Sequence, residues 1–159
     1  MVKYMEDTRY GDGKSASTHD KEEFPAFPCR FLSESRARIL GEGGKEEVDV
    51  IAVDEGQFFA DLPAFVEEMA ERGKLVIVAA LSGTYRRETF SVIGEVMAKA
   101  EKLDMLSAVC MVCYRPASFS WRMSGEDEVH VIGGSDKYKA VCRTCYMNLS
   151  QGLAPTSID

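Results

Sequence analysis

Long apolar runs are missing from this sequence, since no stretch approaches the roughly 20 apolar residues that a membrane-spanning helix needs. No apolar signal region follows the start either, so we expect a soluble, cytoplasmic protein. Basic residues are also in short supply: 19 Lys and Arg side chains face 26 Asp and Glu side chains, for a formal net charge of −7. Because such a chain repels a polyphosphate backbone, we predict neither nucleic acid nor membrane as a partner.

Internal repeats and low-complexity tracts are absent, and a chain of 159 residues has room for one domain with a small appended module. Residues 1–4 have the composition of the end of a strand, and residues 11–20 have that of a polar loop. The acidic stretch 41–47 is most simply a solvated loop.

The central part of the chain predicts a parallel crossover. Residues 48–53 are rich in β-branched side chains and resemble a buried strand. Asp61 can cap a helix whose apolar residues recur at helical spacing until Gly73, and residues 75–81 form a second strand-length apolar run. The order strand, helix, strand indicates an α/β fold with a parallel sheet.

Only five cysteines occur, and their spacing favours metal over crosslinks. Four of them form two Cys-x-x-Cys pairs, Cys110 with Cys113 and Cys142 with Cys145. Residues 114–141 between the pairs are enough for a hairpin, predicted to turn at 124–127, so four thiolates can close a tetrahedral zinc site. Four sulfur ligands leave no position open for substrate, so this zinc would be structural; buried, inert thiols are the alternative.

The change in composition near Cys110 suggests the domain boundaries. We expect an α/β core over residues 1–108, a zinc-binding module over 109–150 and a tail over 151–159. Cys29, alone beside apolar neighbours, is expected to be a small core residue without a chemical role.

Two carboxylates, Asp54 and Glu55, follow the first predicted buried strand. Nucleotide-binding α/β proteins present an acid to magnesium in this way. The pattern alone leaves open that both side chains are merely solvated or cap the following turn.

Several motifs occur together and in a particular order: Asp7-Thr8-Arg9-Tyr10, Thr18-His19-Asp20, Asp54-Glu55-Gly56-Gln57-Phe58-Phe59, Val78-Ala79-Ala80-Leu81 with Gly83-Thr84-Tyr85, Val131-Ile132-Gly133-Gly134 with Asp136-Lys137-Tyr138, and both cysteine pairs. In type and order they resemble the type II thymidine kinases, the zinc-containing, cytosolic family. The resemblance covers nearly the whole chain. It implies a P-loop-kinase-like parallel sheet with a small zinc-binding lasso module.

The resemblance also implies a reaction: transfer of the γ-phosphate of ATP to the 5'-hydroxyl of thymidine, or of deoxyuridine, in the salvage of deoxynucleosides for DNA synthesis. By position, Glu55 matches the catalytic base, and Asp54 would help to hold Mg²⁺. The other residues on the ATP side would be Asp7, Thr8, Arg9, Gly56 and Gln57. The family further implies a homo-oligomer, a tetramer.

The nucleoside side is implied in the same way. Phe58 and Leu81 would line the pocket, and Tyr85 and Tyr138 match aromatic positions that contact substrate. A lasso loop would hold the base mainly through its main chain, at Val129, His130, Val131, Ile132 and Gly133. Each residue also has a plain structural alternative, as a loop salt bridge or a packing side chain.

Other residues suited to chemistry receive weaker interpretations. His19 and the side chain of His130 are interpreted as structural, because phosphoryl transfer needs one base and a metal, and Glu55 already supplies the base. Arg86, Arg87 and Arg122 have the geometry to meet phosphate, with Arg122 the best candidate, although surface arginines are commonly solvated.

The chain contains no GxxxxGK[ST] motif, the phosphate-binding loop of such kinases. The segment Gly11-Asp12-Gly13-Lys14-Ser15 ends suitably, but its first glycine is too close and no strand of useful length precedes it. We expect an N-terminally truncated kinase, inactive as it stands, with Met1 inside the second strand of the fold; a true fragment and a degenerate paralogue are the alternatives. The second function class is a non-catalytic, zinc-stabilised interaction module.

Overall fold

The computed structural model describes residues 1–6, 15–17, 23–44, 46–123 and 137–153. The chain divides into two compact units, one formed by residues 1–82 and 89–101 and the other by residues 83–88 and 102–159. In the described part of the chain, no helix has the length and apolar character to cross a bilayer.

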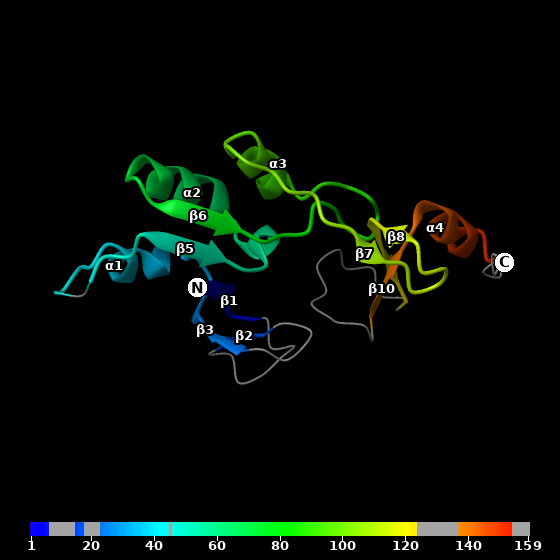
Figure 1. The fold of residues 1–159 in the computed structure, drawn as a ribbon, viewed down its shortest axis with the longest axis horizontal. Helices are drawn as coiled ribbons and strands as arrows, with labels where there is room; N and C mark the ends of the chain where they lie inside the picture. Colours follow the sequence, from blue (N-terminus) through cyan, green and yellow to red (C-terminus); the bar gives the residue numbers. More distant parts are fainter. Residues whose placement is uncertain (7–14, 18–22, 45, 124–136, 154–159) are drawn as a thin grey trace. The chain divides into compact units, whose positions relative to one another are not determined.

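The first unit is built on a parallel sheet of four strands, as the sequence predicts (Figure 1). Its strands are β1 (Val2–Tyr4), β4 (Phe27–Cys29), β5 (Val50–Val53) and β6 (Leu75–Val78), arranged in the order β4-β1-β5-β6. Val50 pairs with Leu75 and Val53 with Val78, in the register of a parallel crossover. β1 pairs with both β4 and β5, so it lies inside the sheet.

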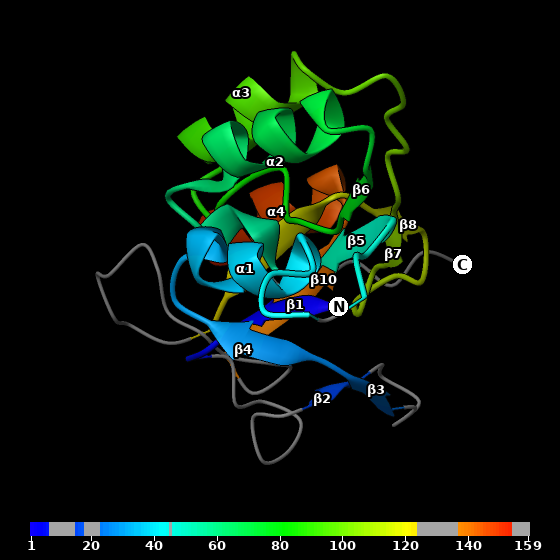
Figure 2. The same cartoon turned by 90° about the vertical axis from the view of Figure 1, so that its left-hand side faces the viewer.

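Helices connect these strands and supply most of the core. The 3-10 helix η1 (Leu32–Ser35) and α1 (Arg36–Ile39) follow β4, the 3-10 helix η2 (Gly56–Phe58) and α2 (Leu62–Glu71) follow β5, and α3 (Ser91–Met97) comes after β6. Figure 2 shows α3 beside α2 on one side of the sheet. Phe59, Leu62 and Met69 are fully buried there with Leu32 and Cys29.

Alternate residues of β5 and β6 pack into the core, buried in β5 and partly buried in β6. Ile51 and Val53 belong to the core, whereas Val50, Leu75 and Ile77 are 52%, 58% and 54% exposed. This alternation is what a sheet covered on one face requires. The sequence suggested a buried strand over residues 48–53, whereas Val50 within it is exposed.

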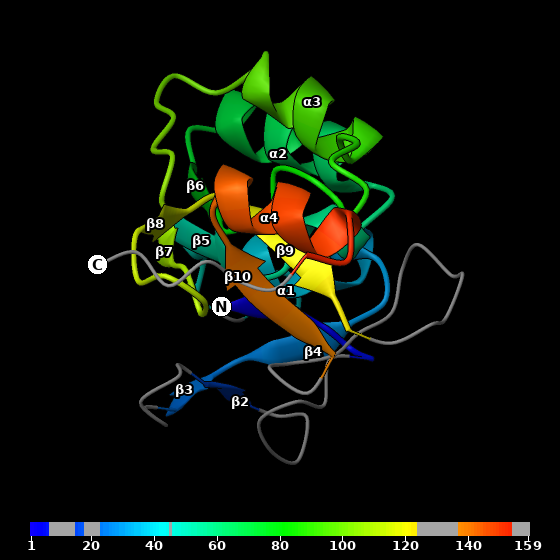
Figure 3. The ribbon, with the colours of Figure 1, turned by 90° about the vertical axis from the view of Figure 1, so that its right-hand side faces the viewer.

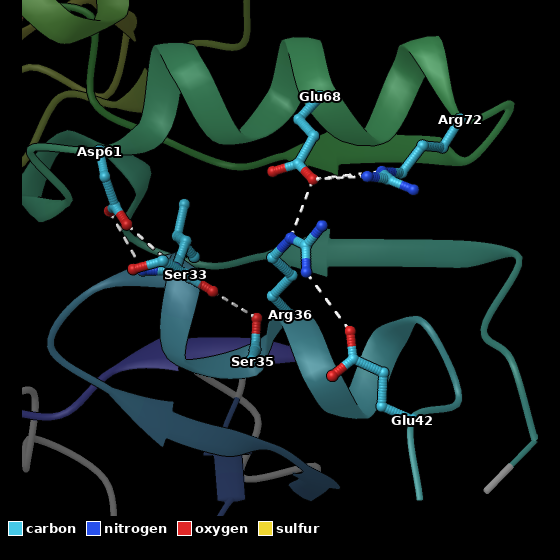
Figure 4. Close-up of polar contacts among 8 residues, drawn as sticks. Ser33, Ser35, Arg36, Glu42, Asp61, Glu68 and Arg72 are labelled. Atoms are coloured by element: carbon cyan, nitrogen blue, oxygen red, sulfur yellow. Dashed lines mark hydrogen bonds and ion pairs between the residues drawn. The ribbon is translucent and has the colours of Figure 1, made fainter. Parts of the chain in front are cut away.

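The Asp61 side chain does not form the predicted cap of α2. Asp61 stands at the N-cap position of α2 but caps no amide of that helix. Its two carboxylate oxygens instead accept hydrogen bonds from the backbone amides of Leu32 at 3.1 Å and Ser33 at 3.0 Å (Figure 4). Asp61 therefore ties the start of α2 to the start of η1.

A second polar link joins α2 to α1, the helix that follows η1. Glu68 of α2 accepts from Arg36 of α1 at 2.9 Å and from Arg72 at 3.1 Å, and Arg36 also meets Glu42 at 3.3 Å (Figure 4). Glu42 and Glu47, which pairs with Lys74 at 2.8 Å, belong to the acidic stretch that we expected to be simply solvated. Both carboxylates therefore have ion-pair partners within the first unit.

The described residues of the second unit form two short antiparallel ladders and one helix. β7 (Ala108–Val109) pairs with β8 (Pro116–Ala117), and β9 (Phe119–Arg122) pairs with β10 (Tyr138–Val141). Figure 3 shows the β9–β10 pair with α4 (Arg143–Ser150) beside it. The predicted hairpin turn at 124–127 lies outside the described residues, although the strands that flank it do pair.

Two segments differ from the sequence-based expectation. Ser15–Ser17 is strand β2, paired with β3 (Glu23–Pro25), because partner-strand hydrogen bonds can organise polar residues that alone suggest a loop. Strand β6 ends at Val78, three residues before its apolar run does. Residues 83–88 group with the second unit together with residues 102–159; the expected domain boundaries after residues 108 and 150 stay predictions.

Candidate functional site

The backbone of Glu55 adopts a conformation that non-glycine residues rarely take. At φ 54° and ψ 44° it lies in the left-handed region, two residues after the end of β5 and immediately before η2. The Asp54 carboxylate accepts a hydrogen bond from the Glu55 amide at 3.0 Å. Strained conformations of this kind persist where the surroundings determine them, and they are frequent at functional sites.

The Gln57 amide holds the Glu55 side chain. The backbone N–H of Leu81 donates to Oε1 of Gln57 at 3.1 Å, and Gln57 Nε2 donates to a carboxylate oxygen of Glu55. Because an N–H can only donate, Leu81 determines which end of the Gln57 amide faces the carboxylate. Gln57 is only 5% exposed, so a buried bridge connects the acidic loop to the segment after β6.

Gly56 permits the close packing of this loop. A Cβ at this position would lie 2.7 Å from Cγ1 of Val78 and 3.3 Å from Cδ2 of Leu62. The Gly56 amide donates to the carbonyl of Ala79 at 2.9 Å. The glycine is therefore required by the approach of the backbone to β6.

Aromatic rings gather beside the same loop. The Tyr4 ring of β1 lies 5.4 Å from that of Phe58 and 5.3 Å from that of Phe59, between ring centroids. Phe59 is fully buried and Phe58 half-buried, while Leu81 is 50% exposed. The structure thus brings Asp54, Glu55, Gln57, Phe58 and Leu81 together in the first unit.

The four paired cysteines converge as predicted. One Sγ from each of Cys110, Cys113, Cys142 and Cys145 lies within 4.8 Å of all the others, and the Cys113 and Cys142 sulfurs are 3.6 Å apart. A tetrahedral site with Zn–S bonds of about 2.3 Å needs sulfurs roughly 3.8 Å apart. The geometry and the donor set therefore fit zinc.

Local backbone structure presents these thiols. The chain turns between β7 and β8, where Tyr114 takes φ 62° and its amide donates to the Cys110 carbonyl at 2.9 Å. Burial acts to raise the pKa of the Cys110 thiol, but amide hydrogen bonds from Cys142, Cys113 and Val112 outweigh it and lower the pKa to about 6. Amide donors that stabilise a thiolate suit a metal ligand.

Cys29 has the opposite environment. It is fully buried on β4, and burial, followed by the charges of Glu34 and Asp61, raises the pKa of its thiol to about 12. The thiol therefore stays protonated and poorly nucleophilic, in agreement with the expected core position.

Tyr85 and Tyr138 meet at one arginine in the second unit. The Arg122 guanidinium carbon lies 4.0 Å from the Tyr85 ring centroid and 5.1 Å from that of Tyr138. Arg122 is only 8% exposed, so it is not a solvated surface arginine, and its contact with phosphate stays a prediction. Arg86 and Arg87 are exposed, and they lie over the rings of Tyr85 and Tyr146 respectively.

Two contacts were missed by the sequence reasoning. The first is Tyr146, whose hydroxyl donates to the Tyr85 carbonyl at 2.8 Å; its place directly after Cys145 was the available signal. The second is the Tyr4 ring beside Phe58, for which the sequence offered no signal. Several predicted site residues lie outside the described residues: Asp7, Thr8, Arg9 and the lasso positions Val129, His130, Val131, Ile132 and Gly133. His19, which we interpreted as structural, lies outside them too.

Comparison with known sequences agrees with this arrangement. The family described as thymidine kinase matches residues 1–146. The chain belongs to the thymidine kinase family. Its paired cysteines and its acidic loop after β5 are consistent with the zinc-containing type that its motifs resemble.

Individual relatives are similar over most of this chain. Thymidine kinase 1 of Dictyostelium discoideum is 46% identical over 149 residues, which are 92% of this chain and 63% of that protein. The thymidine kinase of Myxoma virus (strain Lausanne) is 49% identical over 146 residues, 92% of this chain and 78% of the viral protein. The cytosolic thymidine kinase of Homo sapiens is 45% identical over 152 residues, 96% of this chain and 62% of the human protein. The chain thus spans less than two thirds of the length of these two cellular relatives.

Proposed function

We propose that this chain forms the substrate-binding and base-bearing part of a kinase that phosphorylates thymidine, and also deoxyuridine, at the 5'-hydroxyl. The product is the nucleoside monophosphate, used for DNA synthesis. Like the relatives named cytosolic, it would act in the cytoplasm. We further propose the homotetramer that the family resemblance implies.

In this proposal Glu55 takes the proton from the 5'-hydroxyl as its oxygen attacks the γ-phosphate of ATP. A carboxylate suits this task when its position is fixed before the reaction. Support comes from the left-handed backbone at Glu55 and from the buried Gln57 amide that donates to its side chain. This constrained carboxylate is the single observation that carries the proposal.

Asp54 would help to hold the Mg²⁺ that neutralises the phosphates, together with the ATP-side residues Asp7, Thr8, Arg9, Gly56 and Gln57. Phe58, Leu81, Tyr85, Tyr138 and the lasso positions 129–133 would contact the nucleoside. Zinc, held by the four cysteines, would supply no chemistry but would tie the β7–β8 turn to the start of α4.

Nucleoside selectivity tests the proposal directly. Calorimetric titration of the purified chain with thymidine, deoxyuridine and deoxyguanosine should give measurable affinity for the two pyrimidines only, because a loop closing on one flat ring leaves no room for a second. Phe58→Ala should weaken thymidine binding, whereas Phe24→Ala, an exposed aromatic on β3, serves as the matched control. Equal binding of deoxyguanosine would contradict the proposed substrate class.

The second candidate is a non-catalytic, zinc-stabilised interaction module. The observation that favours it is the lack of a GxxxxGK[ST] motif among the 159 residues. ATP binding separates the two candidates: a form of the chain that binds MgATP and turns over thymidine supports the kinase. A zinc-loaded chain that binds neither nucleoside nor nucleotide supports the module.

A further inference from the structure

A buried arginine connects three segments of the second unit. Arg122 lies on β9 directly opposite Tyr138 on β10, in the antiparallel register of that ladder. Tyr85 lies in the turn 83–88, far away in sequence but in the same unit. One guanidinium therefore contacts both of the tyrosines that we propose as nucleoside contacts.

The contacts use different parts of the guanidinium. Its carbon lies 4.0 Å from the Tyr85 ring centroid, the distance of close stacking, while Nη2 donates a hydrogen bond to the Tyr138 hydroxyl. A planar, delocalised cation can stack on one ring and donate from its edge to another group at the same time. A lysine ammonium has no plane, so it cannot stack on a ring while donating from its edge.

The Tyr85 turn is held at three points. The Tyr146 hydroxyl donates to the Tyr85 carbonyl at 2.8 Å, Arg86 Nε donates to the Tyr85 hydroxyl at 2.9 Å, and Arg122 stacks on the ring. Even so, the side chains of Tyr85 and Tyr138 stay only half-buried. Both tyrosines are supported from within the protein and keep surface for a ligand.

Burying a guanidinium in a protein core is energetically unfavourable. Taking a cation out of water costs free energy that an apolar side chain of similar length would not incur. Apart from the metal-ligand cysteines, the buried cluster described in this unit consists of Ala117, Val141 and Tyr146, and none of these side chains is charged. This free-energy cost has a functional reason if the arginine orients groups that must contact a ligand.

We propose that Arg122 is a positioning residue that locks Tyr85 and Tyr138 into one surface for the pyrimidine nucleoside. This rests on the proposed function, because it takes both tyrosines as nucleoside contacts. Arg122 acts through the two rings and does not itself contact substrate. The arrangement predicts that nucleoside affinity depends on the planar cation and not only on charge.

The test compares Arg122→Met and Arg122→Lys with Arg143→Met in the complete, zinc-loaded chain. Arg143 is the matched control, because its guanidinium also lies over a ring, that of Phe119 at 4.9 Å, but is exposed. Thymidine and thymidine monophosphate are titrated by calorimetry. Ring resonances of tyrosine-labelled protein are followed by NMR, and zinc content verifies the fold.

Arg122→Met should weaken both ligands equally, by on the order of tenfold, as expected for one stacked cation and its hydrogen bond. The resonances of Tyr85 and Tyr138 should shift together, with zinc content unchanged. Arg122→Lys should recover only part of the affinity, and Arg143→Met should change neither affinity nor those resonances.

Three results would overturn the proposal. A loss confined to the monophosphate would make Arg122 a phosphate contact, and full affinity in Arg122→Lys would reduce its role to charge. Loss of zinc from Arg122→Met would make it a folding residue. If the unaltered chain binds no thymidine, the proposed function fails. If the ring resonances of Tyr85 and Tyr138 nevertheless shift together in Arg122→Met, the arginine orients the two rings but has no role toward a nucleoside.

Discussion

At the scale of single residues, Glu55 combines a strained backbone with a side chain held by a buried amide. If it is the general base, Glu55→Gln should lower kcat by on the order of 100-fold or more, because base catalysis acts in the transition state. Nucleoside affinity should change little. The measurement is steady-state kinetics on a form of the enzyme that carries a GxxxxGK[ST] loop.

The neighbouring carboxylate provides the control for that experiment. Asp54→Asn should impair the magnesium dependence of the reaction instead, because its proposed partner is the cation. A Glu55→Gln enzyme with normal turnover would remove Glu55 from the mechanism.

A second prediction at the residue scale concerns Gly56 and can be tested by protein stability, without an activity assay. Gly56→Ala should destabilise the first unit by about 1 to 3 kcal/mol, because the new methyl group would meet Val78 at 2.7 Å and force the backbone away from β6. Gly94→Ala is the control, since nothing lies within 4 Å of its Cβ position in α3. That change should be neutral or stabilise by up to about 1 kcal/mol. Denaturant unfolding measures both, and equal effects would contradict the close approach.

At the scale of elements, the link between η1 and α2 depends on one carboxylate. Asp61→Ala leaves the amides of Leu32 and Ser33 without their acceptor and should cost about 1 to 3 kcal/mol of unfolding free energy. Glu42→Ala removes only an exposed ion pair with Arg36 and should cost less than about 1 kcal/mol. If both variants unfold at the same denaturant concentration, Asp61 does not connect the two elements.

The β7–β8 turn and α4 should be held together by metal. The purified chain should contain about one zinc per molecule, the number a single four-cysteine site takes, and Cys142→Ser should lower that content strongly. Cys29→Ser should keep its zinc, because Cys29 lies in the other unit.

A chelator should change the fluorescence of the only tryptophan, Trp121, whose ring packs against Tyr146 at 5.3 Å between centroids. Undiminished zinc in Cys142→Ser would contradict the ligand set.

At the scale of the whole molecule, catalysis needs a phosphate cradle that these 159 residues do not encode as a GxxxxGK[ST] motif. The chain as given should therefore show negligible thymidine kinase activity and no ATP affinity at millimolar nucleotide. The Mg²⁺ that we propose for Asp54 cannot replace a ring of backbone amides and a lysine. The measurement is radiolabel transfer to thymidine with protein freed of host kinase. Clear activity would require another segment to act as the loop, with residues 11–15 the candidate.

Local chemistry made much of this protein predictable from its sequence alone. Strand-length apolar runs around residues 50 and 75, with a helical repeat between them, already specify a parallel crossover, because the period of buried residues depends on backbone geometry. Two cysteine pairs predict a tetrahedral site for a similar reason, since ligand type and spacing are local properties. The order of the motifs was enough to identify the family.

Tertiary structure decided what depends on partners far away in the chain. Asp61 could be placed at a helix start, but only folding determined that its carboxylate accepts from Leu32 and Ser33. Arg122 resembled a surface cation until the β9–β10 register set it opposite Tyr138 and the turn 83–88 brought Tyr85 against it. Likewise, the Leu81 amide orients Gln57 toward Glu55 across two different loops. Such contacts depend on register and on which elements share a core, and neither is set by local sequence periodicity.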